Sequence, residues 1–304
     1  MSVVNSIRNI AEKMPYSSRR FMYTAYERFI ELITKPVSSR LPVLFVVGSQ
    51  RSGTTLLGLI LDSHPDIKMH EEEESYTLLK IKGDQNVKLI EGFKIPVWTS
   101  RYRFLKKAFP HSKVVYLRRD MRSIVSSMLR LKSGSLSWVS RHGWREIERS
   151  ISFVSDLRTR NFFLKTYSAC SHENDEVTAA ALCAYLKMYL LEEYFKIGLN
   201  VLECWYEDLV IQPENETRHI LEFLGLKWSP EVLHHHEKHE GIAIGGTRKN
   251  RPVDVASTMK WQSQLTEIEK QKIYEFDDSC RLSIGECYFS PFRDCCQATS
   301  DTGV

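Results

Sequence analysis

The sequence lacks any apolar run approaching the ~18 residues that a membrane-spanning helix requires. Its N-terminal stretch, MSVVNSIRNIAEKMPYSSRR, has no uninterrupted apolar segment of the kind found in signal peptides. The seven cysteines are an odd number and include no C-x-x-C pair, so neither a disulfide framework nor a zinc knuckle is indicated. We therefore expect a cytoplasmic protein that does not enter a membrane.

A charge excess of one sign is also missing. Lys and Arg total 42 and Asp and Glu total 38, and this net charge of +4 is too small to favour nucleic acid as a partner. The apolar content of 42% in 304 residues is ample for the core of one large α/β domain. Any basic binding site must therefore be local.

Three short, β-branched apolar runs predict buried parallel strands, each followed by a helix. The runs cover residues 43–47, 113–119 and 200–206. The second helix opens at Asp120, a good N-cap, and the third begins after Pro213. Repeated strand-helix units predict an α/β fold, a single P-loop-type domain with a central parallel sheet flanked by helices.

The remaining segments define the expected organisation around this domain of residues 41–290. Apolar residues at helical spacing in residues 1–40 predict two amphipathic helices, which pack on the core or on a partner subunit in a homodimer. Residues 132–177 are polar and irregular, and we expect them to form a lid or an acceptor-site insertion. Residues 291–304 are expected to form a tail.

The stretch GSQRSGTT, residues 48–55, follows the first strand and has the G-x-x-x-x-G spacing of a phosphate-binding loop. Such a turn presents backbone N–H groups and the positive end of a helix dipole to an anion. Thr54 stands where an ATP- or GTP-using enzyme carries lysine, while Arg51 adds a rigid fork of donors. The loop therefore suits a short anion better than a triphosphate with magnesium.

The second strand-helix unit, YLRRDMRSIVSS, supplies a further pair of donors. Arg119 ends the strand and Ser127 lies eight residues later in the next helix, so both can clamp a second phosphate. A P-loop small-molecule kinase is the alternative from another class, and it requires a lysine and an acidic magnesium ligand. Thr54 contradicts the first requirement, and Asp120, as a helix cap, meets the second poorly. A nucleotide-binding scaffold without turnover is a third possibility.

The blocks GSQRSGTTLLGLILDSHPD, LRRDMRSIVSS, WYEDLVIQPE and RKNRPVD...KW occur in the order found in sulfotransferases that use 3′-phosphoadenosine 5′-phosphosulfate (PAPS). The sequence resembles this family from about residue 43 to about residue 261, and is most similar to its protein-tyrosine sulfotransferase branch. The resemblance implies transfer of a sulfuryl group by in-line displacement, with adenosine 3′,5′-bisphosphate (PAP) as product and no metal.

The resemblance also implies a set of donor-binding residues. The loop residues matching those that hold the 5′-phosphosulfate are Arg51, Ser52, Gly53, Thr54 and Thr55. Arg119 and Ser127 match the pair that binds the 3′-phosphate. Tyr206 matches the tyrosine that contacts the adenine region, and Arg248 with Lys249 matches the late basic loop over the nucleotide.

The catalytic residues implied by the same resemblance are Arg51, Lys94 and Glu72. Lys94 matches a lysine near the bridging oxygen of the leaving phosphate, and with Arg51 it would stabilise the charge that develops there. Glu72, in the motif MHEEEES, matches the general base, with Glu71 and His70 as alternates.

The expected acceptor is a small molecule with a hydroxyl or amine group. The lumenal tyrosine sulfotransferases that the sequence resembles carry an N-terminal membrane anchor and a disulfide. That disulfide joins a cysteine just before the acidic motif to one near the lysine block, and here the places of these two cysteines hold Met69 and residues 91–93. Peptide or protein tyrosine is therefore the second choice. Four consecutive glutamates, residues 71–74, favour a cationic acceptor.

Two groups of residues have a structural explanation beside the functional one. His235 and His239 have the i, i+4 spacing of a metal site, but no carboxylate or cysteine set completes it, so we expect no metal. Trp98, Trp138 and Trp144 can line the acceptor site or fill the core, and the sequence leaves both options open.

Overall fold

The computed structural model describes residues 43–71, 90–133, 136–243, 247–285 and 290–293. The helices expected in residues 1–40 lie outside these residues, as do most of the expected tail and Glu72. Within the described part, no helix is both long and apolar enough to cross a bilayer.

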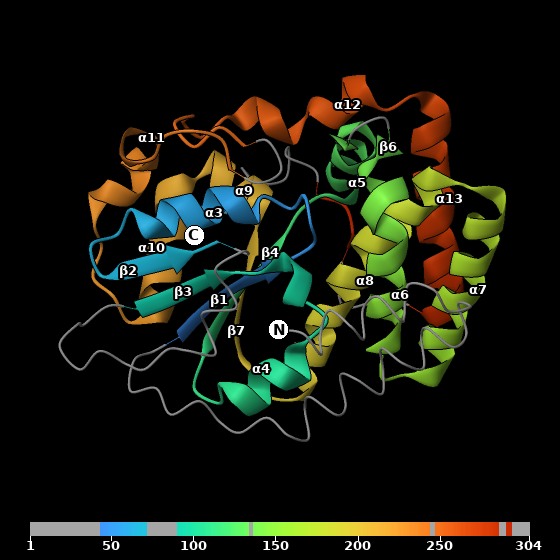
Figure 1. Ribbon diagram of the computed structural model, residues 1–304, viewed down its shortest axis with the longest axis horizontal. Coiled ribbons are helices and arrows are strands. Elements are labelled where there is room, and N and C mark those ends of the chain that lie inside the picture. The colour runs from blue at the N-terminus through green and yellow to red at the C-terminus, as the bar shows by residue number, and fades with distance from the viewer. Residues whose placement is uncertain (1–42, 72–89, 134–135, 244–246, 286–289, 294–304) are drawn as a thin grey trace, which may run out of the picture.

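The centre of the molecule is a sheet of five parallel strands in the order β2-β3-β1-β4-β7 (Figure 1). The strands are β1 (Val43–Gly48), β2 (Ile67–His70), β3 (Ile90–Lys94), β4 (Lys113–Arg118) and β7 (Asn200–Trp205). The three predicted strands, β1, β4 and β7, are confirmed. The sequence missed β2 and β3, because IKMH and IEGFK are short and mix polar with apolar residues.

Helices cover both faces of the sheet, as predicted (Figure 1). One face packs against α3 (Thr54–Asp62), α9 (Tyr206–Ile211) and α10 (Pro213–Leu224). The other packs against α4 (Tyr102–Ala108) and the C-terminal half of α8 (Glu176–Lys196). Every residue of β1 is buried, as expected for a central strand with helices on both sides.

A second hydrophobic core lies beside the sheet, among helices alone. Its members are the N-terminal half of α8 with α5 (Met121–Arg130), α6 (Trp144–Ser152), α7 (Leu157–Glu173) and α13 (Glu267–Ile284). Trp138 and Trp144 pack against this core, and Trp98 packs against the core beside α4, edge to face with Phe104 at 5.4 Å between ring centroids.

The polar, irregular sequence of residues 132–177 forms regular structure over most of its described residues. The segment contains a two-stranded hairpin, β5 (Lys132–Ser133) with β6 (Leu136–Ser137), then a short π-helix, η3 (Val139–Gly143), then α6 and α7. Val139, Ile147, Ile151 and Phe163 are buried completely in the helical core. These few apolar residues are enough to hold the helices because every one of them faces the core. A role in acceptor binding stays a prediction.

The segment after α10 closes over the carboxyl edge of the sheet. Its described elements are η4 (Pro230–His234), α11 (His235–Lys238), loop residues 239–243 and 247–254, η5 (Val255–Thr258) and α12 (Lys260–Gln264). Figure 1 shows α11 and α12 on the same side of the sheet as α3. The loop predicted after Lys238 is confirmed in its described residues.

The carboxyl ends of β1 and β4 lie side by side, because Gly48 pairs with Leu117 in the parallel ladder. The phosphate-loop segment leaves the sheet directly after β1, and Arg119 follows β4. At the N-terminus of α5, the Asp120 carboxylate accepts hydrogen bonds from the backbone N–H groups of Arg122 and Ser123, which confirms the predicted cap. Ligands bind at this edge in open parallel sheets, where the strand order changes direction.

Candidate active site

The phosphate-loop segment, residues 48–55, has a backbone that only a few residue types can adopt. Gly53 has φ 100°, and a Cβ atom there would lie 2.3 Å from Cδ2 of Tyr206. Arg51 has φ 70°, which is uncommon for a residue with a side chain. The turn leads directly into the nine-residue helix α3, whose first N–H groups have no partner within the helix. The loop is therefore built to bring backbone donors close to an anion.

Arg51 and Arg119 meet beside this loop. Arg119 Nη1 donates to the backbone carbonyl oxygen of Arg51 at 3.1 Å, and Arg51 Nε donates to the hydroxyl of Ser127 at 2.9 Å. Burial lowers the pKa of Arg51, and the positive charge of Arg119 lowers it further. The two guanidinium groups thus present their donors beside the loop, which is the chemistry that binds phosphate groups.

Arg119 also connects the loop to the segment that closes over it. Its Nη2 donates to the backbone carbonyl oxygen of Ser257 in η5 at 3.0 Å, and its guanidinium lies 4.1 Å from the ring centroid of Tyr206. The hydroxyls of Tyr206 and Ser257 are 2.7 Å apart. Arg119 and Tyr206 thus hold the phosphate loop and η5 in a fixed relation.

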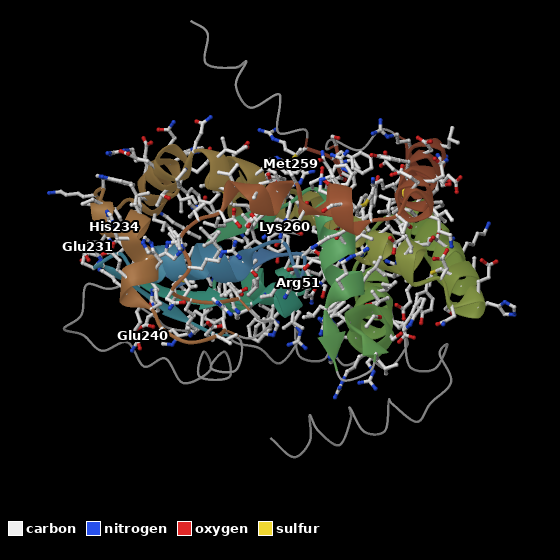
Figure 2. All side chains as sticks on the ribbon, turned by 90° about the horizontal axis from the view of Figure 1, so that it is seen from above. Arg51, Glu231, His234, Glu240, Met259 and Lys260 are labelled. Carbon is white, nitrogen blue, oxygen red and sulfur yellow. The ribbon has the colours of Figure 1, made fainter. Side chains whose placement is uncertain are left out.

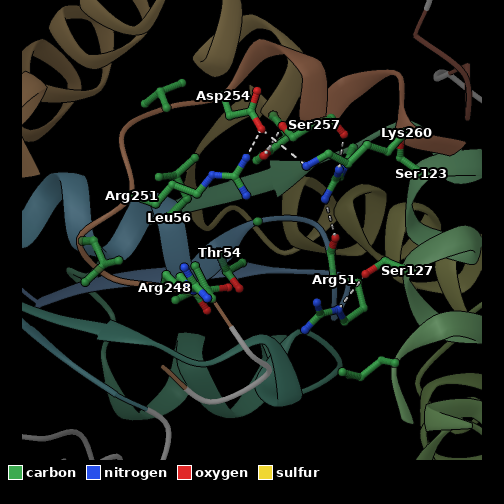
Figure 3. Close-up of a pocket in the computed structure, with 18 of the residues that line it drawn as sticks. Arg51, Thr54, Leu56, Ser123, Ser127, Arg248, Arg251, Asp254, Ser257 and Lys260 are labelled. Carbon is green, nitrogen blue, oxygen red and sulfur yellow. Dashed lines mark hydrogen bonds and ion pairs between the residues drawn. The ribbon is translucent and has the colours of Figure 1, made fainter. Parts of the chain in front are cut away.

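These elements surround a cavity of about 530 Å³ (Figure 3). Six lysine and arginine side chains line it: Arg51, Arg119, Arg130, Arg248, Arg251 and Lys260. Asp254 is the acidic residue among the described lining residues, and it pairs with Arg251 and, at 3.4 Å, with Lys260. Figure 3 shows Arg51 and Ser127 meeting on one side of the cavity. Its electrostatic character suits a ligand with several negative charges.

Eight of the residues predicted to bind the donor line this cavity: Arg51, Gly53, Thr54, Thr55, Arg119, Ser127, Tyr206 and Arg248. Ser52, which is fully buried, and Lys249 are outside its lining in the described part of the chain. The sequence did not single out Arg130, Arg251, Ser257 or Lys260, which also line the cavity. Arg251, in RKNR, and Lys260, in KW, belong to a block that carries the family resemblance and could have been included, whereas Arg130 and Ser257 come from segments with no local signal.

Lys94 joins the loop to the acidic motif. Its side chain is 5% exposed, and its Nζ lies 2.8 Å from a carboxylate oxygen of Glu71 and 3.5 Å from the hydroxyl of Thr55. Lys249 Nζ lies 3.7 Å from the other oxygen of Glu71. Glu71 is therefore held between two of the basic residues that the sequence predicts for the site.

The three candidates for the general base are placed differently. Glu72, the first choice, lies outside the described residues. His70 stacks on Phe93, with ring centroids 4.9 Å apart, and its Nε2 pairs with Glu91 on β3. Glu71 is the described candidate that contacts Lys94 and Lys249.

The two histidines with metal-site spacing, His235 and His239, lie in different surroundings. His235 is buried at the cavity wall, and burial, with the neighbouring His236, lowers its pKa to about 4. His239 Nε2 lies instead 3.3 Å from the hydroxyl of Ser63. No group of three or more His, Cys, Asp or Glu side chains in the described residues is arranged to hold a metal ion. Figure 2 shows His234 at one end of the molecule, far from Arg51.

Comparison with known proteins finds relatives of this chain. A sequence profile of the Sulfotransferase family matches residues 42–92 and 77–230. Protein-tyrosine sulfotransferase 1 of Danio rerio is 26% identical over 270 residues, covering 74% of this chain and 67% of that protein. Protein-tyrosine sulfotransferase 2 of Gallus gallus is 25% identical over 270 residues, with 74% and 64% covered. The chain thus spans about two thirds of the length of these two relatives.

Among solved structures, the sulfotransferase domain from the curacin biosynthetic pathway superposes with a TM-score of 0.50 at 15% identity. The match covers 79% of this chain and 99% of that domain. At this level of identity the likeness concerns the fold, and it agrees with the parallel sheet flanked by helices described above.

Proposed function

This chain belongs to the sulfotransferase family, and we propose that it transfers a sulfuryl group from PAPS to an acceptor hydroxyl. The observation that carries the proposal is the convergence of the phosphate loop, Arg119 and Ser127 on one basic cavity. A ligand with phosphate groups at two separate positions would occupy both parts of this arrangement. The kinase alternative lacks support at the loop, where Thr54 replaces the required lysine.

For the donor, we propose that the loop N–H groups and Arg51 bind the phosphosulfate end. Arg119 and Ser127 would bind the 3′-phosphate, and Tyr206, packed against Gly53, would border the nucleotide. The cavity residues fit such a donor because, among the described residues that line it, the positive charges outnumber the carboxylate of Asp254.

For the chemistry, we propose an in-line displacement at sulfur. The acceptor oxygen bonds to sulfur while the bond from sulfur to the phosphate oxygen breaks, and PAP leaves with the electron pair of that bond. Arg51 and Lys94 would stabilise the negative charge that builds on the leaving oxygen. Glu71 would accept the acceptor's proton, since its carboxylate is held 2.8 Å from Lys94 beside the loop.

The acceptor class stays a prediction with two forms. The sequence favours a small molecule with a hydroxyl or amine, and the four glutamates at residues 71–74 favour a cationic one. The relatives are named for protein tyrosine, which supports a tyrosyl hydroxyl in a peptide. Both acceptors present a nucleophilic atom to the same donor geometry.

One experiment tests the donor and the acceptor together. The protein is incubated with 35S-labelled PAPS and a panel of phenols, alcohols, amines and tyrosine peptides, and labelled products are identified by mass. Calorimetry in parallel compares binding of PAP with binding of magnesium-ATP. We expect tight PAP binding and transfer to at least one panel class. Tight magnesium-ATP binding without PAP binding would overturn the proposed donor.

A further inference from the structure

A buried group of charged residues lies behind the phosphate loop, away from the cavity. Glu146, on α6, accepts a hydrogen bond from Nε2 of Gln50, at 2.9 Å to its Oε2. Arg149 Nη2 donates to both oxygens of the same carboxylate, at 2.6 and 2.8 Å. Lys187 Nζ, from α8, lies 3.2 Å from Oε2, and this lysine is completely buried. Gln50 is the residue immediately before Arg51.

The carboxylate of Glu146 is kept charged in this place. Burial alone would raise its pKa, but Arg149 and Lys187 outweigh that effect and lower the pKa to about 2. A charged carboxylate can only accept hydrogen bonds, so the Gln50 side chain must present its NH₂ group to it. The orientation of the Gln50 amide is therefore fixed by Glu146, and the bond is strengthened by the negative charge.

The same helix also holds the beginning of the loop by a second route. Arg149 Nη2 donates to the carbonyl oxygen of Val97, in the 3-10 helix η2 (Pro96–Trp98), at 2.7 Å. Thr99, which caps η2, accepts from the N–H of Gly48 at 3.0 Å, and its hydroxyl lies 2.7 Å from the Gly48 carbonyl oxygen. Gly48 and Gln50 are thus both tied to the unit formed by α6 and η2.

These tethers act on a strained piece of backbone. A residue with a side chain held at φ 70°, as Arg51 is, costs roughly 1 to 3 kcal/mol and persists only where its surroundings enforce it. The backbone on the C-terminal side of the turn is fixed by α3 and by the Ser52 N–H, which donates to Ser49 at 3.1 Å. On the N-terminal side, Arg51 is preceded by Gln50, whose side chain is held by Glu146.

We propose that Glu146 is a positioning residue for sulfuryl transfer: acting through Gln50, it keeps Arg51 in the backbone conformation that binds the donor. The inference rests on the proposed donor site, and it assigns to α6, within the segment 132–177, a function on the donor side of the reaction. Arg149 and Lys187 serve Glu146 by keeping its carboxylate charged and in place.

The test is a double-mutant cycle between positions 50 and 146. Gln50→Met removes the amide at nearly constant size, and Glu146→Gln replaces the charged acceptor. We measure the Kd of PAP by calorimetry, KM for PAPS and kcat, and the free energy of unfolding in urea. Gln50→Met is expected to weaken PAP binding about tenfold, the effect of losing a hydrogen bond to a charged group. Glu146→Gln should weaken it less, because its amide oxygen can still accept from Gln50 but lacks the charge that strengthens the bond. In the Gln50→Met background, Glu146→Gln should weaken PAP binding no further.

The unfolding data separate positioning from general destabilisation. Glu146→Gln leaves Arg149 and Lys187 without their carboxylate, so it should reduce stability in both the wild-type and the Gln50→Met background. Its effect on PAP binding, in contrast, should vanish in the Gln50→Met background. Glu193→Gln is the matched control. Glu193 is also a buried carboxylate, but it accepts hydrogen bonds from Tyr102 and Ser155, so its variant should lose stability while PAP binding stays at the wild-type level.

Two results would overturn the proposal. One is wild-type PAP affinity in Gln50→Met, and the other is an equal loss of affinity from Glu146→Gln in both backgrounds. If the wild-type protein itself fails to bind PAP, the proposed donor is wrong, which is distinguishable because the cycle then has no starting affinity.

Discussion

Arg51 and Ser127 are joined by a hydrogen bond of 2.9 Å from the arginine Nε to the serine hydroxyl, although they are 76 residues apart in the chain. The arginine belongs to the loop after β1, and the serine to the second turn of α5, after β4. The two halves of the proposed donor site are therefore in direct contact.

Ser127→Ala removes this bond and a hydroxyl that lines the cavity. We expect PAP to bind about tenfold more weakly, because one donor to a charged phosphate and one restraint on Arg51 are lost together. Ser126→Ala is the control, since the neighbouring Ser126 hydroxyl bonds to Gln264 instead of Arg51. Equal effects of the two substitutions in calorimetry would contradict the role given to Ser127.

Gly53→Ala should abolish transfer. The added methyl group would lie 2.3 Å from the Tyr206 ring, at a backbone φ of 100° that alanine rarely adopts. We expect kcat/KM for PAPS to fall at least 100-fold, since small displacements of reacting groups have effects of this size. Gly198→Ala is the control: it also has positive φ, 68°, but its Cβ would meet nothing within 4 Å. It should cost only about 1 kcal/mol of stability and leave kcat/KM unchanged.

Glu71→Gln tests the general base. The substitution keeps the shape of the side chain and removes its ability to accept a proton, so kcat should fall about 100-fold or more. PAP binding should change little, since Glu71 does not line the donor cavity in the described structure. Glu91→Gln is the control, because that carboxylate, on β3, pairs with His70 on β2. A large loss of kcat in Glu72→Gln together with an active Glu71→Gln would instead assign the base to Glu72.

Glu207 should make stability depend on pH. Its side chain is 1% exposed, and burial, with the nearby Asp120 charge adding to it and Arg119 opposing it, raises its pKa from 4.5 to about 7. Between these values the folded state holds a proton that the unfolded state has lost. The free energy of unfolding therefore decreases as pH rises from about 4.5 to about 7, by roughly 3 kcal/mol, and then levels off.

The measurement is the difference in unfolding free energy between wild type and Glu207→Gln across this pH range. An amide can still accept the Asp120 N–H, which donates to Glu207 at 3.2 Å, but it does not titrate. Taking the difference cancels the contribution of His235, whose lowered pKa makes the free energy of unfolding fall as pH drops below 6.5. A difference that stays constant from pH 4.5 to 7 would show that folding does not raise the pKa of Glu207.

Much of the fold was readable from local patterns, because a buried central strand leaves an uninterrupted apolar run. The strands β1, β4 and β7 have such runs, whereas β3 pairs with β1 through IEGFK, a stretch whose buried members include Gly92 and Lys94. A lysine inside a buried strand gives no hydrophobic signal. Lys94 is tolerated there because Glu71 faces its ammonium group.

The site residues also include some that local sequence patterns predict and others that they do not. The residues from the loop and from the start of α5 could be named in advance, since each motif places its own donors at a strand end. Glu146 could not, because nothing in WREIERS distinguishes a glutamate that faces Gln50 from one that faces solvent. Arg130 likewise reaches the cavity from α5, whose other face is buried in the helical core, and Lys260 from α12, whose Trp261 packs against that core.

By itself, the sequence determined the strands β1, β4 and β7 with the helices that follow them, and a loop after β1 that carries Thr54 in place of lysine, because helix caps and apolar runs are properties of neighbouring residues. The tertiary structure alone decided which charges meet. Arg119 reaches both Arg51 and Ser257, and Glu146 reaches Gln50, only after the sheet and the helical core have brought segments about 70 to 140 residues apart into contact. Electrostatic forces act over a few ångströms of space, whatever the separation along the chain.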